Sequence, residues 1–92
     1  MTDGEYELVL TSPARRALTE RLSEAVASAV IEFMTSALVE QPRRVGKELR
    51  GDLVGVWSAR RGTYRILYEV HEEAREVVVL RIEHRRDVYR QP

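Results

Sequence analysis

Hydrophobic and polar residues alternate at the start of the chain. Within residues 5–11, every even position up to Leu10 is apolar and most positions between them are polar. This period of two predicts a strand with one buried face. Ser12 and Pro13 follow, and they suit a helix N-cap and the first helical position. We therefore expect a strand over 5–11 and a helix that begins directly after it.

Two amphipathic helices are expected before the middle of the chain. Ser23 and Glu24 suit the start of the second helix, because serine caps free backbone N–H groups and an acid is favourable at the positive helix end. From Val26 to Leu38 the apolar residues recur every three or four positions, and Pro42 ends the pattern. The apolar residues of the two stripes are Ala14, Ala17, Leu18, Leu22, Val26, Ala29, Val30, Phe33, Met34, Ala37 and Leu38.

Three further strands are predicted in the second half of the chain, over 53–60, 63–70 and 76–83. Gly62 marks the turn between the first two. The resulting order is β-α-α-β-β-β. It predicts an α+β fold in which a helical hairpin packs on one face of a mostly antiparallel sheet, as a single domain over residues 1–92.

The parity of residue numbers predicts which strand residues face the helices. In 63–70 and 76–83 the even-numbered residues are apolar, and in 53–60 the odd-numbered set with Trp57 is expected to face inward. The uncovered face then carries one arginine from each strand, namely Arg60, Arg65 and Arg81. This pattern favours a phosphate-binding surface over a face that is merely solvated.

Composition excludes several classes of protein. The 92 residues are 43% hydrophobic and 33% charged, which is typical of one small globular domain. The chain has no cysteine, which excludes a disulfide scaffold, a thiolate zinc site and a cysteine nucleophile. No apolar run approaches the roughly 20 residues of a membrane span. The first ten residues lack the apolar segment of a secretory signal. We therefore expect neither a membrane protein nor an exported one.

The net charge of zero conceals a strong segregation of charge. Residues 1–41 hold three basic and seven acidic residues, whereas residues 42–65 hold seven basic and two acidic ones, a balance of +5. All the basic residues except Lys47 are arginine, which binds phosphate through a planar fork of donors. A GC-rich coding sequence explains an arginine bias equally well, but not its clustering. The middle of the chain is therefore expected to bind a polyanion.

Most catalytic motifs are absent. The two histidines, His71 and His84, lie in different segments, and no acidic pair has the spacing of a two-metal nuclease. No serine lies in a nucleophile elbow. The segment RVGKELRG contains Gly-Lys but lacks the remaining residues of a nucleotide-binding P-loop. We expect no metal and no cofactor.

The last residues of the chain combine three useful side chains. His84 can transfer a proton near neutral pH, Arg85 can stabilise charge on a phosphate, and Tyr89 can stack on a base. Together with Arg65 they suit RNA cleavage without a metal, in which the ribose 2′-hydroxyl attacks the adjacent phosphate and cations stabilise the phosphorane. The alternatives are a turn histidine without a role and a tyrosine that closes the core.

Three segments resemble RelE-type toxins of the RelE/ParE superfamily: 49–51 (LRG), 57–68 (WSARRGTYRILY) and 84–90 (HRRDVYR). The resemblance implies a cytoplasmic toxin of a bacterial type II toxin–antitoxin pair. Its RelE branch cleaves mRNA on the ribosome and is silenced by a RelB-like antitoxin that wraps around the toxin. The toxin–antitoxin complex is then expected to bind operator DNA through the antitoxin.

The same resemblance implies roles for individual residues. Arg65 matches the phosphate-stabilising arginine of the family, and Arg85 and Tyr89 match its C-terminal arginine and tyrosine. Lys47 and Arg50 match the basic loop before the sheet.

The match is incomplete on the second strand of the family. Val56 and Ser58 occupy positions where the well-studied branch has two lysines, and Arg60 and Arg61 are expected to replace them in part. His84, at a position where relatives carry histidine or lysine, is then the first choice of general base. A weaker second choice is Glu48.

The sequence therefore predicts a metal-independent, ribosome-dependent mRNA endoribonuclease. The catalytic residues are expected to be Arg65, His84, Arg85 and Tyr89, and the RNA-binding residues Lys47, Arg50, Arg60, Arg61 and Arg81. Two alternatives remain. One is a ParE-like toxin that poisons DNA gyrase without nuclease activity. The other is an inactive toxin that acts only as an antitoxin-binding co-repressor partner.

Overall fold

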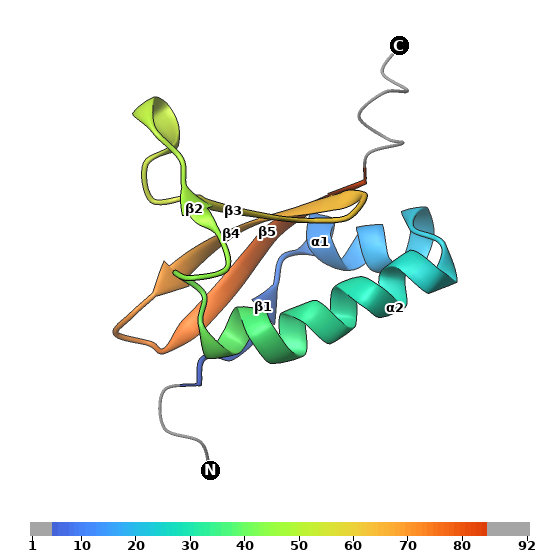
Figure 1. Cartoon of the computed structure of the whole chain (residues 1–92), viewed down its shortest axis with the longest axis horizontal. Helices are drawn as coiled ribbons and strands as arrows, with labels where there is room; N and C mark the ends of the chain where they lie inside the picture. Colours follow the sequence, from blue (N-terminus) through green and yellow to red (C-terminus); the bar gives the residue numbers. More distant parts are fainter. Residues whose placement is uncertain (1–4, 85–92) are drawn as a thin grey trace.

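Two helices cover one face of a five-stranded sheet in residues 5–84, the part of the chain that the computed structural model describes (Figure 1). The strand order is β1-β5-β4-β3-β2, with β1 parallel to β5 and the other pairs antiparallel. The predicted α+β class and the mostly antiparallel sheet are confirmed. The strands are β1 (Glu7–Leu10), β2 (Lys47–Glu48), β3 (Trp57–Arg61), β4 (Tyr64–His71) and β5 (Glu76–His84).

Each helix continues into one turn of π-helix. Helix α1 (Ser12–Arg16) continues as η1 (Ala17–Arg21), and α2 (Glu24–Phe33) continues as η2 (Met34–Leu38). Ser23 caps α2 as predicted, because its hydroxyl accepts from the Val26 N–H at 3.2 Å.

The cap of the first helix lies one residue earlier than predicted. Thr11, not Ser12, is the N-cap, and its hydroxyl accepts from the Ala14 N–H at 3.3 Å. The same hydroxyl donates to the Leu80 carbonyl of β5 at 2.8 Å. Thr11 therefore joins the start of the helix to the sheet, which Ser12 would not do from its exposed position.

The strand predicted over 53–60 begins only at Trp57. The residues before it form a projecting loop with one turn of 3-10 helix, η3 (Gly51–Leu53), at its tip (Figure 1). Turn hydrogen bonds hold the loop, including Leu53 N–H to the Arg50 carbonyl at 3.3 Å. Leu53 and Val54 are consequently 54% and 67% exposed, and the prediction that Leu53 faces inward is wrong.

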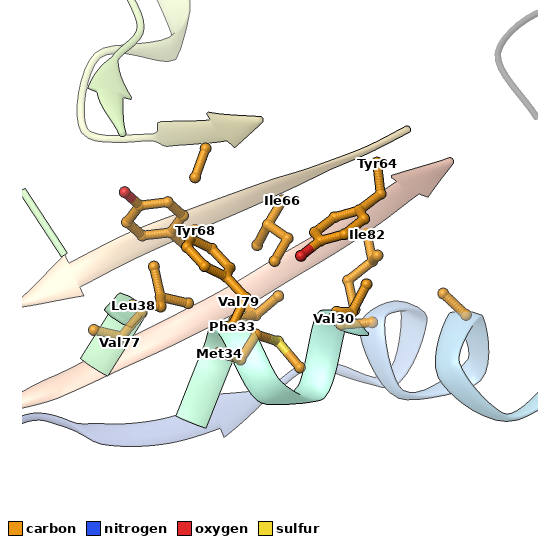
Figure 2. Packing of buried hydrophobic residues seen from close by; sticks show 13 residues of the cluster. Val30, Phe33, Met34, Leu38, Tyr64, Ile66, Tyr68, Val77, Val79 and Ile82 are labelled. Carbon is orange, nitrogen blue, oxygen red and sulfur yellow. The ribbon is translucent and has the colours of Figure 1, made fainter. Parts of the chain in front are cut away.

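The core lies between α2 and the central strand β4 (Figure 2). Ile66 and Tyr68 of β4 are fully buried, in agreement with the even-numbered pattern predicted for this strand. They pack with Val30 and Met34 of the helix. Complete burial of one such side chain contributes roughly 1.5–3 kcal/mol, so this layer makes a large contribution to the stability of the fold.

A β-bulge changes the face pattern of β5. Leu67 pairs with Arg81 and Tyr68 pairs with Val79, which leaves Leu80 as an extra residue. Before the bulge the odd-numbered Val77 and Val79 are buried, and after it the even-numbered Ile82 is buried. The prediction of an even-numbered buried set throughout 76–83 is therefore wrong for the first half of the strand.

Tyr68 ties the sheet to the loop that follows α2. Its hydroxyl donates to the Pro42 carbonyl at 2.6 Å. Burial raises the pKa of Tyr68 to about 12, so the phenol stays neutral and remains a donor. The backbone of Gly46 passes directly over this hydroxyl, where a Cβ atom would lie 2.2 Å from the phenol oxygen.

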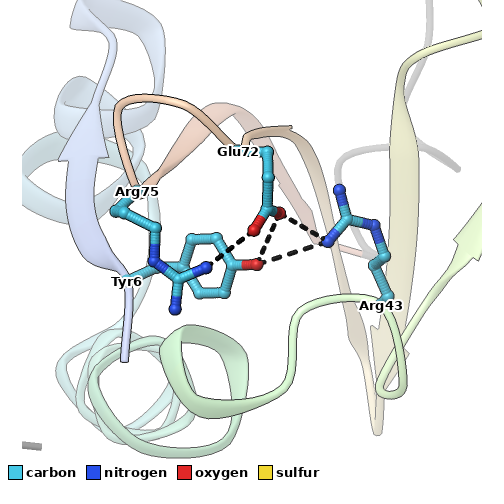
Figure 3. A network of polar contacts seen from close by, with 4 residues as sticks. All are labelled: Tyr6, Arg43, Glu72 and Arg75. Carbon is cyan, nitrogen blue, oxygen red and sulfur yellow. Dashed lines mark hydrogen bonds and ion pairs between the residues drawn. The ribbon is translucent and has the colours of Figure 1, made fainter. Parts of the chain in front are cut away.

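A polar network closes the end of the sheet near β1 (Figure 3). The Glu72 carboxylate accepts from the Tyr6 hydroxyl at 2.7 Å, from Arg43 at 2.9 Å and from Arg75 at 2.7 Å. The Arg75 guanidinium also lies 4.1 Å from the centre of the Tyr6 ring. Arg75 has a φ of 55° in the β4–β5 turn, and these contacts hold it in that left-handed conformation.

Replacing Glu72 with glutamine is expected to destabilise the protein more near neutral pH than in acid. The hydrogen bond from Tyr6 and then that from Arg43 lower the pKa of Glu72 in the folded state. The contribution of the carboxylate is therefore complete above the pKa of the unfolded chain and is lost as the pH falls through the folded-state pKa. Urea midpoints of wild type and Glu72→Gln should differ at about pH 7 and approach each other as the pH falls below the unfolded-chain pKa of about 4.3. A constant difference would contradict this role.

Candidate functional site

The uncovered face of the sheet carries a transverse row of three charged residues. Arg60 of β3 pairs with Arg65 of β4, and Arg65 pairs with Glu83 of β5. Residues opposite each other on neighbouring strands share a face, with Cβ atoms about 5 Å apart. Two arginines and one glutamate therefore lie side by side, and the predicted juxtaposition of Arg60 and Arg65 is present.

Arg65 is bonded to Glu83 in this row. Its Nε lies 3.1 Å from Glu83 Oε1, and its Nη2 contacts the same oxygen. The Arg65 side chain is 39% exposed and that of Glu83 is 21% exposed. Arg81 Nε lies 3.9 Å from the other oxygen of Glu83. The carboxylate is thus held between two arginines of the uncovered face.

A second row adds two further cations to this face. Lys47 pairs with Ser58, Ser58 with Leu67, and Leu67 with Arg81. Lys47 and Arg81 are exposed at the two ends of the row. Together with Arg60 and Arg65 they form the cationic face, by which we mean Lys47, Arg60, Arg65 and Arg81.

Arg61 and Arg50 lie apart from the cationic face. Arg61 pairs with Tyr64, whose side chain faces the helices, and the Arg61 guanidinium lies 4.7 Å from the centre of the Phe33 ring. Arg61 therefore packs on α2 rather than beside Arg65. Arg50 is exposed at the start of the projecting loop.

His84 also lies on the side of the sheet that faces the helices. It pairs with Tyr64, whose hydroxyl points to the Ala29 carbonyl of α2 at 3.4 Å. His84 Nε2 lies 3.0 Å from the Thr63 hydroxyl. Because successive strand residues point to opposite faces, Glu83 and not His84 shares the face of Arg65. The structure does not bring His84 and Arg65 together.

The other predicted candidates do not complete the site within residues 5–84. Glu48 pairs with Trp57, and its carboxylate accepts from the Gly55 N–H at 3.0 Å, so it holds the projecting loop. Arg85 and Tyr89 lie outside the described residues. Within the described part of the chain, no group of three or more His, Asp or Glu residues could hold a metal ion.

Glu83 is the site residue that sequence analysis missed. The alternation of residues 76–83 puts Glu83 on the uncovered face, near the end of the strand, but it does not show which residue lies opposite. Its cross-strand register with Arg65 depends on the bulge at Leu80, which no pattern in the sequence indicates. One signal was available: Glu83 is the only acidic residue in the stretch 77–86, which holds three arginines.

The cationic face can hold a chain of phosphates. Its four cations lie in two adjacent rows, and arginine binds phosphate through two parallel N–H bonds. No helix formed by residues 5–84 is long and apolar enough to cross a membrane. A face of this charge suits contact with a polyanion such as a chain of phosphates.

Comparison with known proteins gives a consistent family. Residues 8–89 match the family model described as the ParE toxin of the type II toxin–antitoxin system parDE. Toxin RelG of Mycobacterium tuberculosis is 48% identical over 85 residues, covering 92% of this chain and 97% of that protein. Toxin RelE of the same organism is 41% identical over 88 residues, covering 96% and 90%.

Solved structures agree with these matches. The RelBE2 toxin–antitoxin complex of M. tuberculosis contains a chain that is 47% identical, with a TM-score of 0.85 and coverage of 88% of this chain and 99% of that one. The intact Escherichia coli RelBE complex shares the fold, with a TM-score of 0.70 at 24% identity, covering 86% and 95%. This chain belongs to the RelE/ParE family and is the toxin component of a type II toxin–antitoxin system.

Proposed function

We propose that the toxin is a ribosome-dependent endoribonuclease that cleaves mRNA without a metal ion and so inhibits translation. The cationic face supports this proposal most directly, because four cations in two adjacent rows suit the spaced phosphates of a single RNA strand. Identity of 41–48% to curated RelE and RelG toxins over nearly the whole chain supports the RelE branch of the family.

The proposed reaction forms one bond to phosphorus and breaks another. The ribose 2′-oxygen attacks the adjacent phosphate and loses its proton, and the bond from phosphorus to the 5′-oxygen breaks as that oxygen gains a proton. Arg65 stabilises the extra negative charge of the phosphorane, because a guanidinium is preorganised for two equatorial oxygens. Lys47, Arg60 and Arg81 hold the neighbouring phosphates. Arg50 extends this contact along the loop.

The family resemblance adds two further residues, Arg85 and Tyr89, to the proposed site. Arg85 would add a second charge at the phosphorane, and Tyr89 would stack on a base or donate to a phosphate oxygen. Arg61, which packs on Phe33, is left with a structural role. His84 does not accept the proton of the 2′-hydroxyl in this proposal, because its side chain lies on the other side of the sheet from Arg65.

The partner in this proposal is a RelB-like antitoxin. Support comes from the 47% identical M. tuberculosis chain, whose structure is described as a toxin–antitoxin complex. An acidic segment that folds on contact would complement the cationic face. The complex would bind operator DNA through the antitoxin, and the toxin would act in the cytoplasm, where ribosomes and mRNA meet.

A second function, poisoning of DNA gyrase, is favoured by two observations. The family model that matches residues 8–89 is that of ParE toxins. Val56 and Ser58, at positions where the well-studied RelE branch has lysines, agree with a toxin that performs no cleavage. This alternative needs no proton transfer and no charge stabilisation at Arg65.

Induction of the full chain in growing bacteria separates the two functions. The 5′ ends of mRNA and the gyrase-linked breaks in DNA should be mapped in the same culture, with an uninduced culture as the control. We expect new mRNA ends within translated regions and no increase in DNA breaks. DNA breaks without mRNA ends would establish the gyrase alternative, and neither signal would indicate an inactive toxin.

Replacing His84 with glutamine is expected to leave the cleavage rate within about threefold of wild type. Loss of a general base lowers a rate by about 10²–10⁴-fold, but His84 contacts Thr63 on the side away from Arg65. Single-turnover cleavage of mRNA in ribosome complexes measures the rate. A hundredfold loss with unchanged ribosome binding would show that His84 reaches the phosphate.

A further inference from the structure

We propose that Glu83 competes with phosphate for Arg65 and so lowers the affinity of the cationic face for phosphate. In the free toxin Glu83 occupies the side edge of the Arg65 guanidinium, and an RNA phosphate has to displace it. The inference rests on the proposed role of Arg65 in binding RNA phosphate. It adds a residue, Glu83, whose effect on that binding is opposite in sign to the effect of the cations around it.

The geometry of the Arg65–Glu83 pair carries this inference. Nε and Nη2 form the edge of the guanidinium that binds a phosphate through two N–H bonds, and both contact Glu83 Oε1. Glu83 is the more buried partner, with its side chain 21% exposed against 39% for Arg65. The carboxylate therefore occupies the edge of Arg65 that a phosphate would otherwise bind.

The surroundings of the pair make displacement depend on several phosphates. Arg81 lies 3.9 Å from Glu83 and can keep the carboxylate when Arg65 releases it. Within residues 5–84, the Arg60 guanidinium on the other side of Arg65 has no carboxylate partner. A strand of RNA that also contacts Arg60 and Lys47 gains enough attraction to displace Glu83. A single phosphate would contact Arg65 alone, and the negative charge of the Glu83 carboxylate would repel it.

Glu83→Gln is therefore expected to bind anions more tightly than wild type. Inorganic phosphate should be titrated into the full chain while the Nε–Hε NMR signal of Arg65 is followed, with Arg65→Lys used to assign the signal. We expect affinity for phosphate to rise about tenfold, because the variant removes a charge-assisted competitor from a partly exposed site. An uncleavable 2′-deoxy oligonucleotide should show a rise in affinity of similar size.

Glu69→Gln is the matched control. Glu69 of β4 lies on the same uncovered face as Arg65, and its replacement by glutamine changes the net charge by the same amount as Glu83→Gln. The Glu69 carboxylate, however, pairs with His71 and not with Arg65. We expect its affinity for phosphate to stay within about twofold of wild type, since only long-range electrostatics change. Equal gains in both variants would overturn the inference, because general charge and not competition at Arg65 would then explain them. An unchanged or weaker affinity in Glu83→Gln would overturn it as well.

A titration of the wild-type chain covers the case in which Glu83→Gln does not fold. If phosphate displaces Glu83, the Arg65 Nε–Hε signal and the Glu83 carboxyl signal move together with one apparent dissociation constant. Movement of Arg65 alone would overturn the inference. These titrations contain no ribosome and no cleavable RNA. Failure of the proposed nuclease function would therefore appear in the cleavage assays and leave these results unchanged.

Discussion

Replacing Arg65 with alanine is expected to lower mRNA cleavage on the ribosome by about 10²–10³-fold and to abolish growth arrest. The guanidinium stabilises charge that develops only in the transition state, and one such contact commonly accounts for a rate factor of this size. Arg65 lies mid-face on the central strand with a partly exposed side chain, so its loss leaves the core intact. Single-turnover cleavage and growth after induction measure the two effects.

Two control variants separate this role from general effects of charge and pairing. Arg44→Ala removes an exposed arginine that contacts Gln41 in the loop after α2, and it should cleave like wild type. The double variant Arg65→Ala with Glu83→Gln removes the carboxylate that Arg65→Ala leaves without its partner. Recovery of cleavage in the double variant would mean that unpaired Glu83, and not the missing guanidinium, caused the loss.

The Gly46→Ala variant is expected to lower the free energy of unfolding by about 3 kcal/mol. A Cβ at Gly46 would lie 2.2 Å from the Tyr68 hydroxyl oxygen and 2.8 Å from the Ser58 carbonyl oxygen. The first contact breaks the buried hydrogen bond from Tyr68 to Pro42, and the second requires the loop to move off β3. The urea midpoint of unfolding measures the loss.

A double-mutant cycle tests the cause of that loss. Tyr68→Phe removes the hydroxyl that Gly46→Ala would strike, and alone it should cost roughly 1–2 kcal/mol because the Pro42 carbonyl loses its donor. In the Tyr68→Phe background, Gly46→Ala should cost less than it does in wild type. Strictly additive losses would show that Gly46 is required for a reason other than the close approach of Tyr68.

Local patterns were sufficient to predict the arrangement of helices and most strands. The even-numbered apolar residues of β4 and the three-and-four spacing of α2 are strong signals, because each follows from burial of one face. The region before Trp57 was predicted as strand because Leu53 and Val54 are apolar, yet both are exposed in a loop. Hydrophobicity alone could not distinguish a loop held by turn hydrogen bonds from a buried strand.

The site was harder to predict because it depends on register between strands. Arg60 and Arg65 flank the turn at Gly62, and the parity of residue numbers in their strands predicts that they share the uncovered face. The pairing of Glu83 with Arg65 depends instead on the bulge at Leu80, which is a property of tertiary packing. His84 was grouped with Arg65 by its place in the sequence, although adjacent strand residues face opposite sides.

The chemical ends of the RNA made on purified ribosomes test the central claim most directly. The toxin, its Arg65→Ala variant and a defined mRNA should be combined with ribosomes stalled at a known codon, and both new ends should be identified. We expect a 2′,3′-cyclic phosphate and a 5′-hydroxyl at one site within the ribosome-bound codon, absent with Arg65→Ala. A product with a 5′-phosphate, or mRNA that stays intact on the stalled ribosomes in the presence of the toxin, would contradict metal-independent cleavage by 2′-hydroxyl attack.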